Sequence, residues 1–503
     1  MSRALPLMIQ GTHSDAGKSV IAAAFCRIFA DAGYRTAPFK SQNMALNSYI
    51  TADGKEIGRA QGVQAEAARI EATVEMNPIL IKPTGDSNAQ IVVNGKPYRN
   101  MEAFGYRADF YEQGLQIIGE AYGRLSEQYE RIVIEGAGSP AEVNLNDREF
   151  VNMKMAEIAQ SPVILVGDIE RGGVFASLVG TLQLLNEQER SRVIGVMINK
   201  FRGDKRLLQD GLDWFEDYTG VPVLGVVPHL HGLNIDAEDS VILDRHQSRA
   251  FGEAELDIAV IRLPFISNFT DVDPFFAEED CDVRFISRAS HFGSPDLVII
   301  PGSKNTLADL EFLKQSGLAA CIAEAAEAGE TTVIGICGGF QMLGEDIHDP
   351  EEVESSLQSA RGLSLLPVQT TMAKEKRTVR SFGTLHYDGA SYEIDGYEIH
   401  MGKTTVNGAP LIEMSTHDDG CVSENGRVFG TYFHGLFHND AFRHGLLNEL
   451  RQQKSLEPLT ERVSYQQLRE EAYDKLAQHV KEHVDIKQIE DKMHSFQAEV
   501  RRS

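Results

Sequence analysis

Short apolar segments rich in Val and Ile alternate with longer amphipathic segments along most of the chain. This alternation is typical of parallel strands joined by crossover helices, so the pattern predicts an α/β fold. In the first half, the expected strands are 5–9, 35–39, 131–134, 163–166, 193–198 and 223–227. In the second half they are 258–263, 283–286, 297–300 and 333–336, followed by a more β-rich stretch over 370–432.

A polar segment without a sustained period separates the two halves of this pattern. The chain has 503 residues, which is more than one hydrophobic core usually serves, and this also favours two domains. We therefore expect domains at 1–230 and 256–445, with a linker at 231–255. Residues 446–503 are charged and helix-prone, and we interpret them as a helical C-terminal appendage.

The charge and the apolar runs of the chain exclude several functions. The 48 Lys and Arg residues against 74 Asp and Glu residues give a formal net charge of −26, which argues against a nucleic-acid partner. No apolar run approaches the ~18 residues that a membrane span needs, and the N-terminal apolar stretch is too short for a signal peptide. We therefore expect a cytoplasmic protein with small-molecule partners, and the sequence leaves a homo-oligomer open.

A glycine-containing loop follows the first predicted strand and precedes apolar positions at helical spacing. Its glycines let backbone N–H groups turn toward a phosphate, while a lysine can reach the terminal phosphates and a serine can ligate Mg²⁺. The residues that we assign to this nucleotide site are Gly11, Thr12, Asp15, Gly17, Lys18 and Ser19. The spacing is one residue longer than the standard phosphate loop, and a glycine turn that only caps a helix is the alternative.

Further polar residues follow other predicted strands, at the sheet edge where parallel sheets bind ligands. Glu135 is the candidate metal ligand, Asp168 is a weaker one, and Asn199 could contact an adenine edge. A solvated strand-end carboxylate or a turn-forming asparagine is the alternative for each of them. Basic residues in similar places could gather carboxylates, or could simply face solvent: Lys40, Lys82, Arg171, Lys200 and Arg202.

One of the five cysteines has the sequence context of a nucleophile. Cys337 lies in Gly-Ile-Cys-Gly-Gly, directly after the predicted strand 333–336 and before a helix-like segment. Such a strand-to-helix turn needs small neighbours, and the helix N-terminus lowers the pKa of a thiol. The backbone N–H groups of Gly338 and Gly302 are the expected oxyanion donors. The other cysteines lack this context and are interpreted as small core residues.

A thiolate nucleophile needs a general base, and fifteen histidines are available. We choose His434, which lies just past a β-like run in Phe-His-Gly-Leu-Phe. His400 is the rival, and a satisfied core histidine is the alternative for either. The choice of His434 also depends on the resemblance described next.

The segments named above resemble the CobB/CobQ family of glutamine-dependent amidases of cobalamin biosynthesis, and within that family the cobyric acid synthases. The resemblance covers roughly residues 5–440. Besides the phosphate loop, the Cys337 turn and the His434 segment, it depends on 39–47, 56–61, 76–78, 134–142, 168–175, 198–204, 267–271, 301–306 and 397–400.

The resemblance implies an N-terminal ATP-dependent synthetase domain, similar to dethiobiotin synthetase, and a C-terminal class I glutamine amidotransferase domain. It implies the use of ATP, Mg²⁺ and glutamine to amidate the b, d, e and g carboxylates of adenosylcobyrinic acid a,c-diamide through acyl phosphates. In this scheme Cys337 attacks glutamine, His434 transfers the proton and ammonia is released. Gln341 would contact bound glutamine, and Lys40 the substrate carboxylate.

One position departs from the pattern of many class I amidotransferases, which have a Glu two residues after the catalytic His. That position is Leu436 here, so we expect a Cys–His pair without a third member. What orients His434 is left open by the sequence.

Three alternatives remain at this stage. A cobyrinic acid a,c-diamide synthase would share both domains and amidate other carboxylates, and the segments 39–47 and 168–175 favour our first choice. A partition-type ATPase would not need the Cys337 turn, and His13 occupies the place of that group's signature lysine. A stand-alone glutamine hydrolase or peptidase would not need the nucleotide loop.

Overall fold

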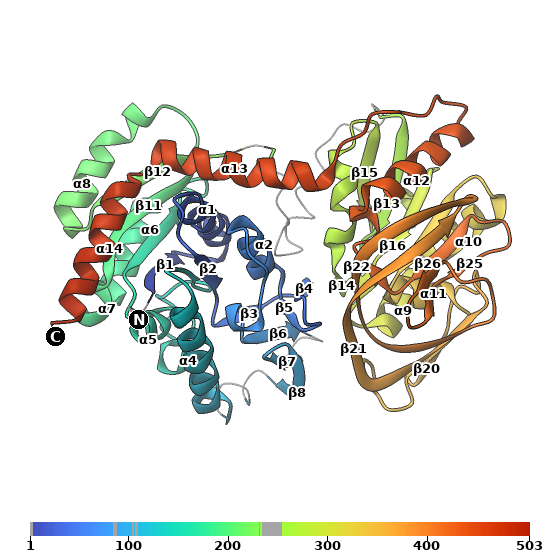
Figure 1. The fold of residues 1–503 in the computed structure, drawn as a ribbon, viewed down its shortest axis with the longest axis horizontal. Helices are drawn as coiled ribbons and strands as arrows, with labels where there is room; N and C mark the ends of the chain where they lie inside the picture. Colours follow the sequence, from blue (N-terminus) through green and yellow to red (C-terminus); the bar gives the residue numbers. More distant parts are fainter. Residues whose placement is uncertain are drawn as a thin grey trace.

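The computed structural model of the chain describes residues 4–83, 88–102, 105, 109–230, 232–233 and 254–502. It consists of two α/β domains, and the last part of the chain runs from the second domain back to the first (Figure 1). The expected linker at 231–255 lies outside the described residues, except for 232–233 and 254–255. Among the helices described, none is long and apolar enough to cross a membrane.

The first domain is built on a parallel sheet with the strand order β12-β11-β10-β1-β9-β2. Every strand expected in the first half of the chain lies in this sheet, so that prediction is confirmed. The strands are β1 (Leu5–Gly11), β2 (Thr36–Phe39), β9 (Arg131–Glu135), β10 (Val163–Asp168), β11 (Val193–Phe201) and β12 (Val223–Pro228). Their near-continuous burial explains the unbroken apolar runs, because helices cover both faces.

Alternate side chains of the strands enter two separate apolar clusters, one on each face of the sheet. Met8 faces the cluster that contains side chains of α4 (Tyr111–Gln128), α5 (Met153–Ala159), α6 (Val174–Leu184) and α8 (Gln209–Thr219). Ile9 faces the cluster that contains α1 (Lys18–Asp31) and the C-terminal helices α13 (Tyr465–His483) and α14 (Ile486–Val500). This domain also contains the helices α2 (Arg59–Ala67) and α7 (Glu187–Ser191).

A second, mainly antiparallel sheet inserted between β2 and α4 was not predicted. Its strands, in spatial order, are β3 (Gln42–Met44), β6 (Ile79–Pro83), β7 (Asn88–Val93) and β8 (Lys96–Glu102), and β4 (Ser48–Ile50) pairs with β5 (Glu56–Gly58) nearby. These strands are short, and β8 is exposed along almost its whole length. Neither the apolar alternation nor the continuous apolar run of a buried strand is therefore present in β8.

The second domain contains a central sheet, parallel except for its last strand, in the order β15-β13-β16-β18-β26-β25. Its strands are β13 (Leu256–Ile261), β15 (Cys281–Ile286), β16 (Leu297–Ile300), β18 (Thr332–Ile336), β25 (Cys421–Val422) and β26 (Val428–Thr431). The four expected strands of the second half are confirmed. The helices are α9 (Thr306–Gln315), α10 (Leu318–Ala328), α11 (Gly338–Leu343) and α12 (Asp440–Gln453).

The β-rich stretch forms a long hairpin of β21 (Val368–Tyr387) and β22 (Ala390–Val406), and β22 pairs with the short strand β27 (Phe433–His434). This hairpin sheet also includes β19 (Asp346–His348), β20 (Ser359–Arg361), β23 (Ile412–Met414) and β24 (Asp418–Asp419). A small separate pair is made by β14 (Ile266–Ser267) and β17 (Gly302–Ser303). The hairpin register places Tyr397 opposite His434, close to the candidate nucleophile's turn.

The segment expected to be an appendage after residue 445 is helical, and its last two helices belong to the core of the first domain. Figure 1 shows α13 running across from the second domain and α14 turning back along the first sheet. Leu476 and Val480 are buried against α1, and Asp485 donates its backbone N–H to the Leu224 carbonyl of β12 at 3.2 Å. Arg27 of α1 is fully buried and ion-paired to Glu470 and Asp474 of α13. These helices look like an appendage in the sequence because charged residues occupy their outer faces.

If α13 is part of the first domain's core, Leu476→Ala lowers that domain's stability by about 2–5 kcal/mol, because a buried leucine is replaced by a cavity. The single tryptophan, Trp214, lies in α8 of the first domain, so urea unfolding followed by tryptophan fluorescence reports on this domain. Lys475→Ala, at the exposed neighbouring position, is the control. Equal unfolding midpoints for the two variants would contradict this role of α13.

Candidate active site

The glycine-containing loop lies between β1 and α1, as predicted. Lys18 is buried and its Nζ donates to the carbonyl oxygens of His13 (2.8 Å), Ser14 (3.0 Å) and Gly138 (3.0 Å). The lysine therefore ties the loop to the segment that follows β9. Thr12 Oγ1 is buried without a hydrogen-bond partner in the described part of the chain, which leaves a hydroxyl available to a ligand at this loop.

The loop is shaped by two close approaches of its glycines. Gly17 has φ +97°, and a Cβ there would lie 2.2 Å from Nδ2 of Asn199. A Cβ on Gly11 would lie 3.1 Å from Cδ of Lys18. Asn199 Nδ2 donates to the Ala16 carbonyl at 3.0 Å, so this side chain supports the phosphate loop from β11.

Glu135 is the centre of the strand-end cluster that the sequence predicted. Its carboxylate is buried and accepts from Ser19 Oγ (2.8 Å) and Lys40 Nζ (2.9 Å) on one oxygen. Gln64 of α2 donates to the other oxygen at 2.5 Å, and Gln61 lies at 3.5 Å. The structure therefore brings Ser19, Lys40 and Glu135 together, and adds two glutamines that the sequence analysis missed.

The weaker candidates at the same sheet edge pair with one another. Asp168 accepts from Lys200 Nζ at 2.8 Å, and Lys200 also donates to the backbone carbonyl of Asp15 at 2.6 Å. Arg171 forms an ion pair of 2.6 Å with the Asp15 carboxylate. Burial alone would raise the pKa of Asp168, but its bonds with Lys200 and the Glu170 N–H lower it. Asp15 therefore lies at the junction of two cations beside the phosphate loop.

A cavity of about 260 Å³ opens beside this cluster, between the inserted sheet and the segment 145–151. Apolar side chains dominate its lining, including Met44, Ile91 and Leu145. Met44 and Leu145 are 59% and 40% exposed, which is unusual for large apolar side chains at adjoining positions. Gln42 also lines the cavity and lies two residues after Lys40, so the cavity adjoins the strand-end cluster.

In the second domain, Cys337 lies on a strained turn between β18 and α11. Its φ and ψ are +52° and −105°, a conformation that side chains rarely adopt. A Cβ on Gly339 would lie 1.9 Å from the Ile300 carbonyl oxygen, and one on Gly338 would lie 2.9 Å from Ser303 N. The glycines flanking the cysteine are therefore required by backbone packing. Cys337 Sγ lies 3.6 Å from the carbonyl oxygen of Ile399.

His434 is fully buried and held by a carboxylate that the sequence analysis missed. Its Nδ1 lies 2.7 Å from Oδ2 of Asp271, which is also buried and accepts from the Gly435 N–H at 2.8 Å. Nε2 of His434 is buried with no hydrogen-bond partner within the described residues, on the side of Cys337. The expectation of a Cys–His pair without a third member is therefore wrong: Asp271 supplies the orienting carboxylate from a distant segment.

The interaction between His434 and Asp271 shifts the pKa values of the two side chains in opposite directions. Burial alone would lower the pKa of His434, but the Asp271 carboxylate and the neighbouring Cys337 raise it to about 10. Burial alone would raise the pKa of Asp271, but the charge of His434, its hydrogen bond and the Gly435 N–H lower it. Both shifts favour an imidazolium beside a carboxylate, and a charged histidine stabilises an adjacent thiolate.

The remaining predicted residues of this half lie near Cys337 and His434, and Gln341 lines a pocket together with Cys337. A Cβ on Gly302 would lie 3.4 Å from Cε1 of His434, which places the Gly302 backbone beside the base. Gln341 is buried, with its side chain bonded to Thr306 Oγ1 (3.1 Å) and Tyr432 OH (2.9 Å). His400, the rival base, also lines the pocket, but its Nδ1 lies 2.8 Å from the carbonyl oxygen of Gly402. Of the two candidate bases, His434 has a carboxylate at hydrogen-bond distance, whereas the carboxylate nearest the His400 ring, that of Glu398, lies 3.6 Å from Nε2.

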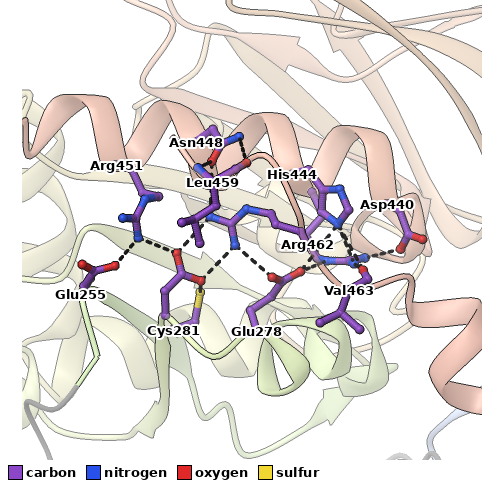
Figure 2. Close-up of polar contacts among 12 residues, drawn as sticks. Glu255, Glu278, Cys281, Asp440, His444, Asn448, Arg451, Leu459, Arg462 and Val463 are labelled. Carbon is purple, nitrogen blue, oxygen red and sulfur yellow. Dashed lines mark hydrogen bonds and ion pairs between the residues drawn. The ribbon is translucent and has the colours of Figure 1, made fainter. Parts of the chain in front are cut away.

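Asp271 lies in the 3₁₀ helix η7 (Phe269–Ala277). A buried network of ion pairs begins directly after this helix (Figure 2). Glu278, directly after η7, accepts from Arg443 Nε at 2.8 Å and from Arg462 Nη1 at 2.9 Å. Asp280 accepts from Arg462 at 2.9 Å and from Arg451 at 2.8 Å. The network fixes the end of η7 against α12 and the chain that leads to α13.

The network also explains why Asp271 and His434 stay aligned. Arg443 of α12 donates to the Phe437 carbonyl at 2.9 Å, a few residues after His434, while its Nε holds Glu278. One arginine thus connects the segment that carries the base with the segment that carries its carboxylate. Breaking a buried ion pair costs several kcal/mol, so this connection resists independent movement of the two segments.

The residues that the sequence analysis missed share one property: their partners are far away in the chain. Asp271 and His434 are 163 positions apart, and Gln64 and Glu135 are 71 positions apart. A weak signal was present, because Asp271 ends the segment 267–271 that contributes to the family resemblance. No role followed from it, since η7 has no periodic pattern that places a carboxylate beside a histidine.

Comparisons with known proteins agree with this arrangement. Residues 7–241 match the CobQ/CobB/MinD/ParA nucleotide binding domain, and residues 257–442 match the CobB/CobQ-like glutamine amidotransferase domain. A cobyric acid synthase of Anoxybacillus flavithermus is 63% identical over 498 residues, 99% of each chain. Those of a Geobacillus species and of Geobacillus thermodenitrificans are 60% and 58% identical over 499 residues, with at least 99% of each chain covered. This chain is a glutamine-dependent amidoligase and belongs to the cobyric acid synthase family.

Proposed function

We propose that the protein converts adenosylcobyrinic acid a,c-diamide to cobyric acid by amidating its b, d, e and g carboxylates with ATP and glutamine. The observation that carries the proposal is a single chain that holds a phosphate-loop cluster and a buried Cys–His–Asp arrangement. The pocket of Cys337 is partly walled by Lys82 of the first domain, so this pocket lies at the domain boundary. A partition-type ATPase or a stand-alone hydrolase would need only one of these sites.

The first domain would activate the carboxylate. A carboxylate resists ammonia because its carbon is electron-rich and its oxygen is a poor leaving group, so ATP must first convert it to an acyl phosphate. Lys18 and the loop N–H groups would hold the phosphates, and Lys40 would contact the attacking carboxylate. Asp15 and Asn199 would border the nucleotide.

The residues around the loop fit a magnesium ion that the nucleotide helps to hold. Ser19 and Glu135 offer hydroxyl and carboxylate oxygens, the ligand type that Mg²⁺ prefers. No group of three or more His, Cys, Asp or Glu able to hold a metal occurs within the described ranges, so phosphate oxygens would complete the coordination. When bound, the ion neutralises phosphate charge during transfer.

The second domain would release ammonia from glutamine. Cys337 Sγ attacks the side-chain amide carbon, and the N–H groups of Gly338 and Gly302 stabilise the resulting oxyanion. His434 Nε2 gives a proton to the departing nitrogen, which leaves as ammonia, and water then cleaves the glutamyl thioester to glutamate. Asp271 keeps Nδ1 of His434 protonated and the ring oriented. Gln341 would form the pocket wall beside the amide.

The apolar cavity beside Glu135 would accept the body of the corrinoid. The macrocycle is much larger than the reacting carboxylate and its ring faces are largely apolar, whereas its carboxylates and amides lie on the periphery, so it must extend from Lys40 over neighbouring surface. The cavity lined by Met44, Ile91 and Leu145 is the apolar surface that adjoins Lys40 in this region.

The direct test is to incubate the protein with adenosylcobyrinic acid a,c-diamide, ATP, Mg²⁺ and glutamine, and to follow the corrinoid by mass spectrometry. We expect four successive conversions of carboxyl to amide, ending at cobyric acid. Glutamine hydrolysis with an unchanged corrinoid mass would retain the amidotransferase but refute the substrate. In a parallel incubation with cobyrinic acid, amidation at the a and c positions only, with no reaction of the a,c-diamide, would favour the related diamide synthase.

Cys337→Ala abolishes glutamine-driven amidation and leaves ammonia-driven amidation intact, because only the thiol is lost. Asp271→Asn lowers glutamine-driven turnover by about 10²–10⁴-fold, since the histidine loses its orienting carboxylate. Both rates are measured by mass spectrometry of the corrinoid, with glutamine or with ammonium chloride. Glu279→Gln, at an exposed position just past η7, is the control. Unchanged glutamine use by either variant would contradict its assigned role.

Met44→Glu raises the KM for the corrinoid by about tenfold or more, because a carboxylate placed in an apolar cavity repels the substrate's carboxylates and loses apolar contact. The KM for ATP and the rate of glutamine hydrolysis both stay unchanged. Leu207→Glu, at an 87% exposed apolar position in the 3₁₀ helix Lys205–Leu207, is the matched control. If both variants have the same corrinoid KM, the cavity is not the corrinoid site.

A further inference from the structure

Glutamine brings two charges into the Cys337 pocket besides the amide that reacts. Its α-carboxylate and α-ammonium both lose water on binding, and each needs an opposite charge or good hydrogen bonds in compensation. The pocket is lined by Cys337 and Gln341, and it also contains charged side chains for which the reaction at the amide has no use. These are Lys82, Lys304, Lys376 and Glu354.

Two of the lysines are already paired by a carboxylate that connects the domains. Glu56 of the first domain is fully buried, and its two oxygens contact Lys82 Nζ at 2.7 Å and Lys376 Nζ at 2.5 Å. Lys82 belongs to the first domain and Lys376 to β21 of the second. Burial and the nearby lysines 82 and 304 lower the pKa of Lys376 to about 7, although Glu56 opposes this. Two cations share one anion here, so the pocket keeps a surplus of positive character.

Lys304 has a different environment. Its Nζ donates to the amide oxygen of Gln90, a first-domain residue, at 3.3 Å. Within the described residues no carboxylate lies at ion-pair distance from it, and burial together with Lys82 lowers its pKa. A half-buried ammonium whose hydrogen-bond partner is an amide, with no carboxylate at ion-pair distance within the described residues, gains most when an anionic ligand arrives.

Glu354 is the carboxylate of the pocket. Its Oε2 accepts from the backbone N–H of Thr306 at 3.1 Å, at the start of α9. Asp349 holds the preceding loop, because its side chain accepts from the N–H groups of Val353 and Glu354. Burial raises the pKa of Glu354, and the charge of Lys304 opposes the rise. The position of this carboxylate is therefore fixed by two separate sets of hydrogen bonds.

We propose that these groups recognise glutamine as a zwitterion, with Lys304 binding its α-carboxylate and Glu354 its α-ammonium, while Lys82 and Lys376 add positive charge on the carboxylate side. This inference rests on the proposed role of Cys337 as the glutamine-cleaving thiol. It makes the glutamine site a property of both domains, because Gln90, Lys82 and Glu56 of the first domain set the environment of the lysines that the second domain contributes.

The test compares three substrates that share the reacting amide: L-glutamine, glutaramate, which lacks the α-ammonium, and L-glutamine α-amide, which lacks the α-carboxylate. Ammonia release is measured with the full chain in the presence of ATP, Mg²⁺ and the corrinoid. The wild-type enzyme should prefer L-glutamine over either analogue by at least about tenfold in kcat/KM. If the wild-type enzyme has the same kcat/KM for an analogue as for L-glutamine, the proposal that the enzyme recognises the group missing from that analogue is overturned.

Two variants assign the groups. Glu354→Gln should lose at least about tenfold in kcat/KM for L-glutamine, while its kcat/KM for glutaramate stays within about threefold of wild type. Lys304→Met should show the converse, with loss on L-glutamine and little change on the α-amide. Exposed neighbours provide matched controls, Glu352→Gln and Lys374→Met. Ammonia-driven amidation, which bypasses the pocket, verifies that each variant is folded.

The outcomes separate this inference from the function on which it rests. If a variant of Lys304 or Glu354 loses kcat/KM equally on all three substrates, the residue has a structural role and the proposal for it is overturned. If the variant keeps the wild-type preference among the three substrates, the proposal for that residue is overturned as well. Failure of the wild-type enzyme to release ammonia from glutamine would instead refute the proposed function itself.

Discussion

The buried carboxylate of Glu56 holds together the domain boundary at which the Cys337 pocket lies. It has no exposed surface and pairs with one lysine from each domain, Lys82 and Lys376. A buried charge is costly unless it is paired, so separating the domains would leave Glu56 with half of its compensation and Lys376 with none of it. The two ion pairs of Glu56 therefore fix how the two domains are arranged, rather than adding much to the stability of the protein. That geometry encloses the Cys337 pocket.

The two sites share one structural arrangement, although their proposed chemistry differs. In each, a glycine turn follows a buried parallel strand, and a buried carboxylate from another segment orients the working side chains. Glu135 holds Ser19 and Lys40 in the first domain, and Asp271 holds His434 in the second. Burial makes both arrangements rigid, because a carboxylate removed from water keeps its partners close. The free-energy cost of removing each carboxylate from water is offset by several hydrogen bonds to it.

Local patterns in the sequence were enough to predict the six strands of the first central sheet, four strands of the second and the two glycine turns. Strands such as β16 are buried on both faces, so their apolar runs are continuous, whereas β8 is exposed and has no such run. The proximity of Ser19 to Glu135 could be expected because the glycine loop follows β1 and Glu135 ends the neighbouring strand β9. Asp271 could not, since its contact with His434 spans 163 positions and η7 has no periodic pattern. The place of α13 in the first domain's core depends on contacts of similar range.

The return of α13 to the first domain gives a physical reason for keeping both activities in one chain. Arg462, which precedes α13, is part of the ion-pair network that fixes η7, and Arg27 anchors the first half of the helix to α1 through Glu470 and Asp474. The segment therefore joins the support of Asp271 to the helix that begins at the phosphate loop. Under the proposed function, ammonia formed at Cys337 would be useful only where an activated carboxylate is near. A domain arrangement fixed by α13 and by Glu56 keeps the two reaction sites at a constant separation, which independent proteins could not do.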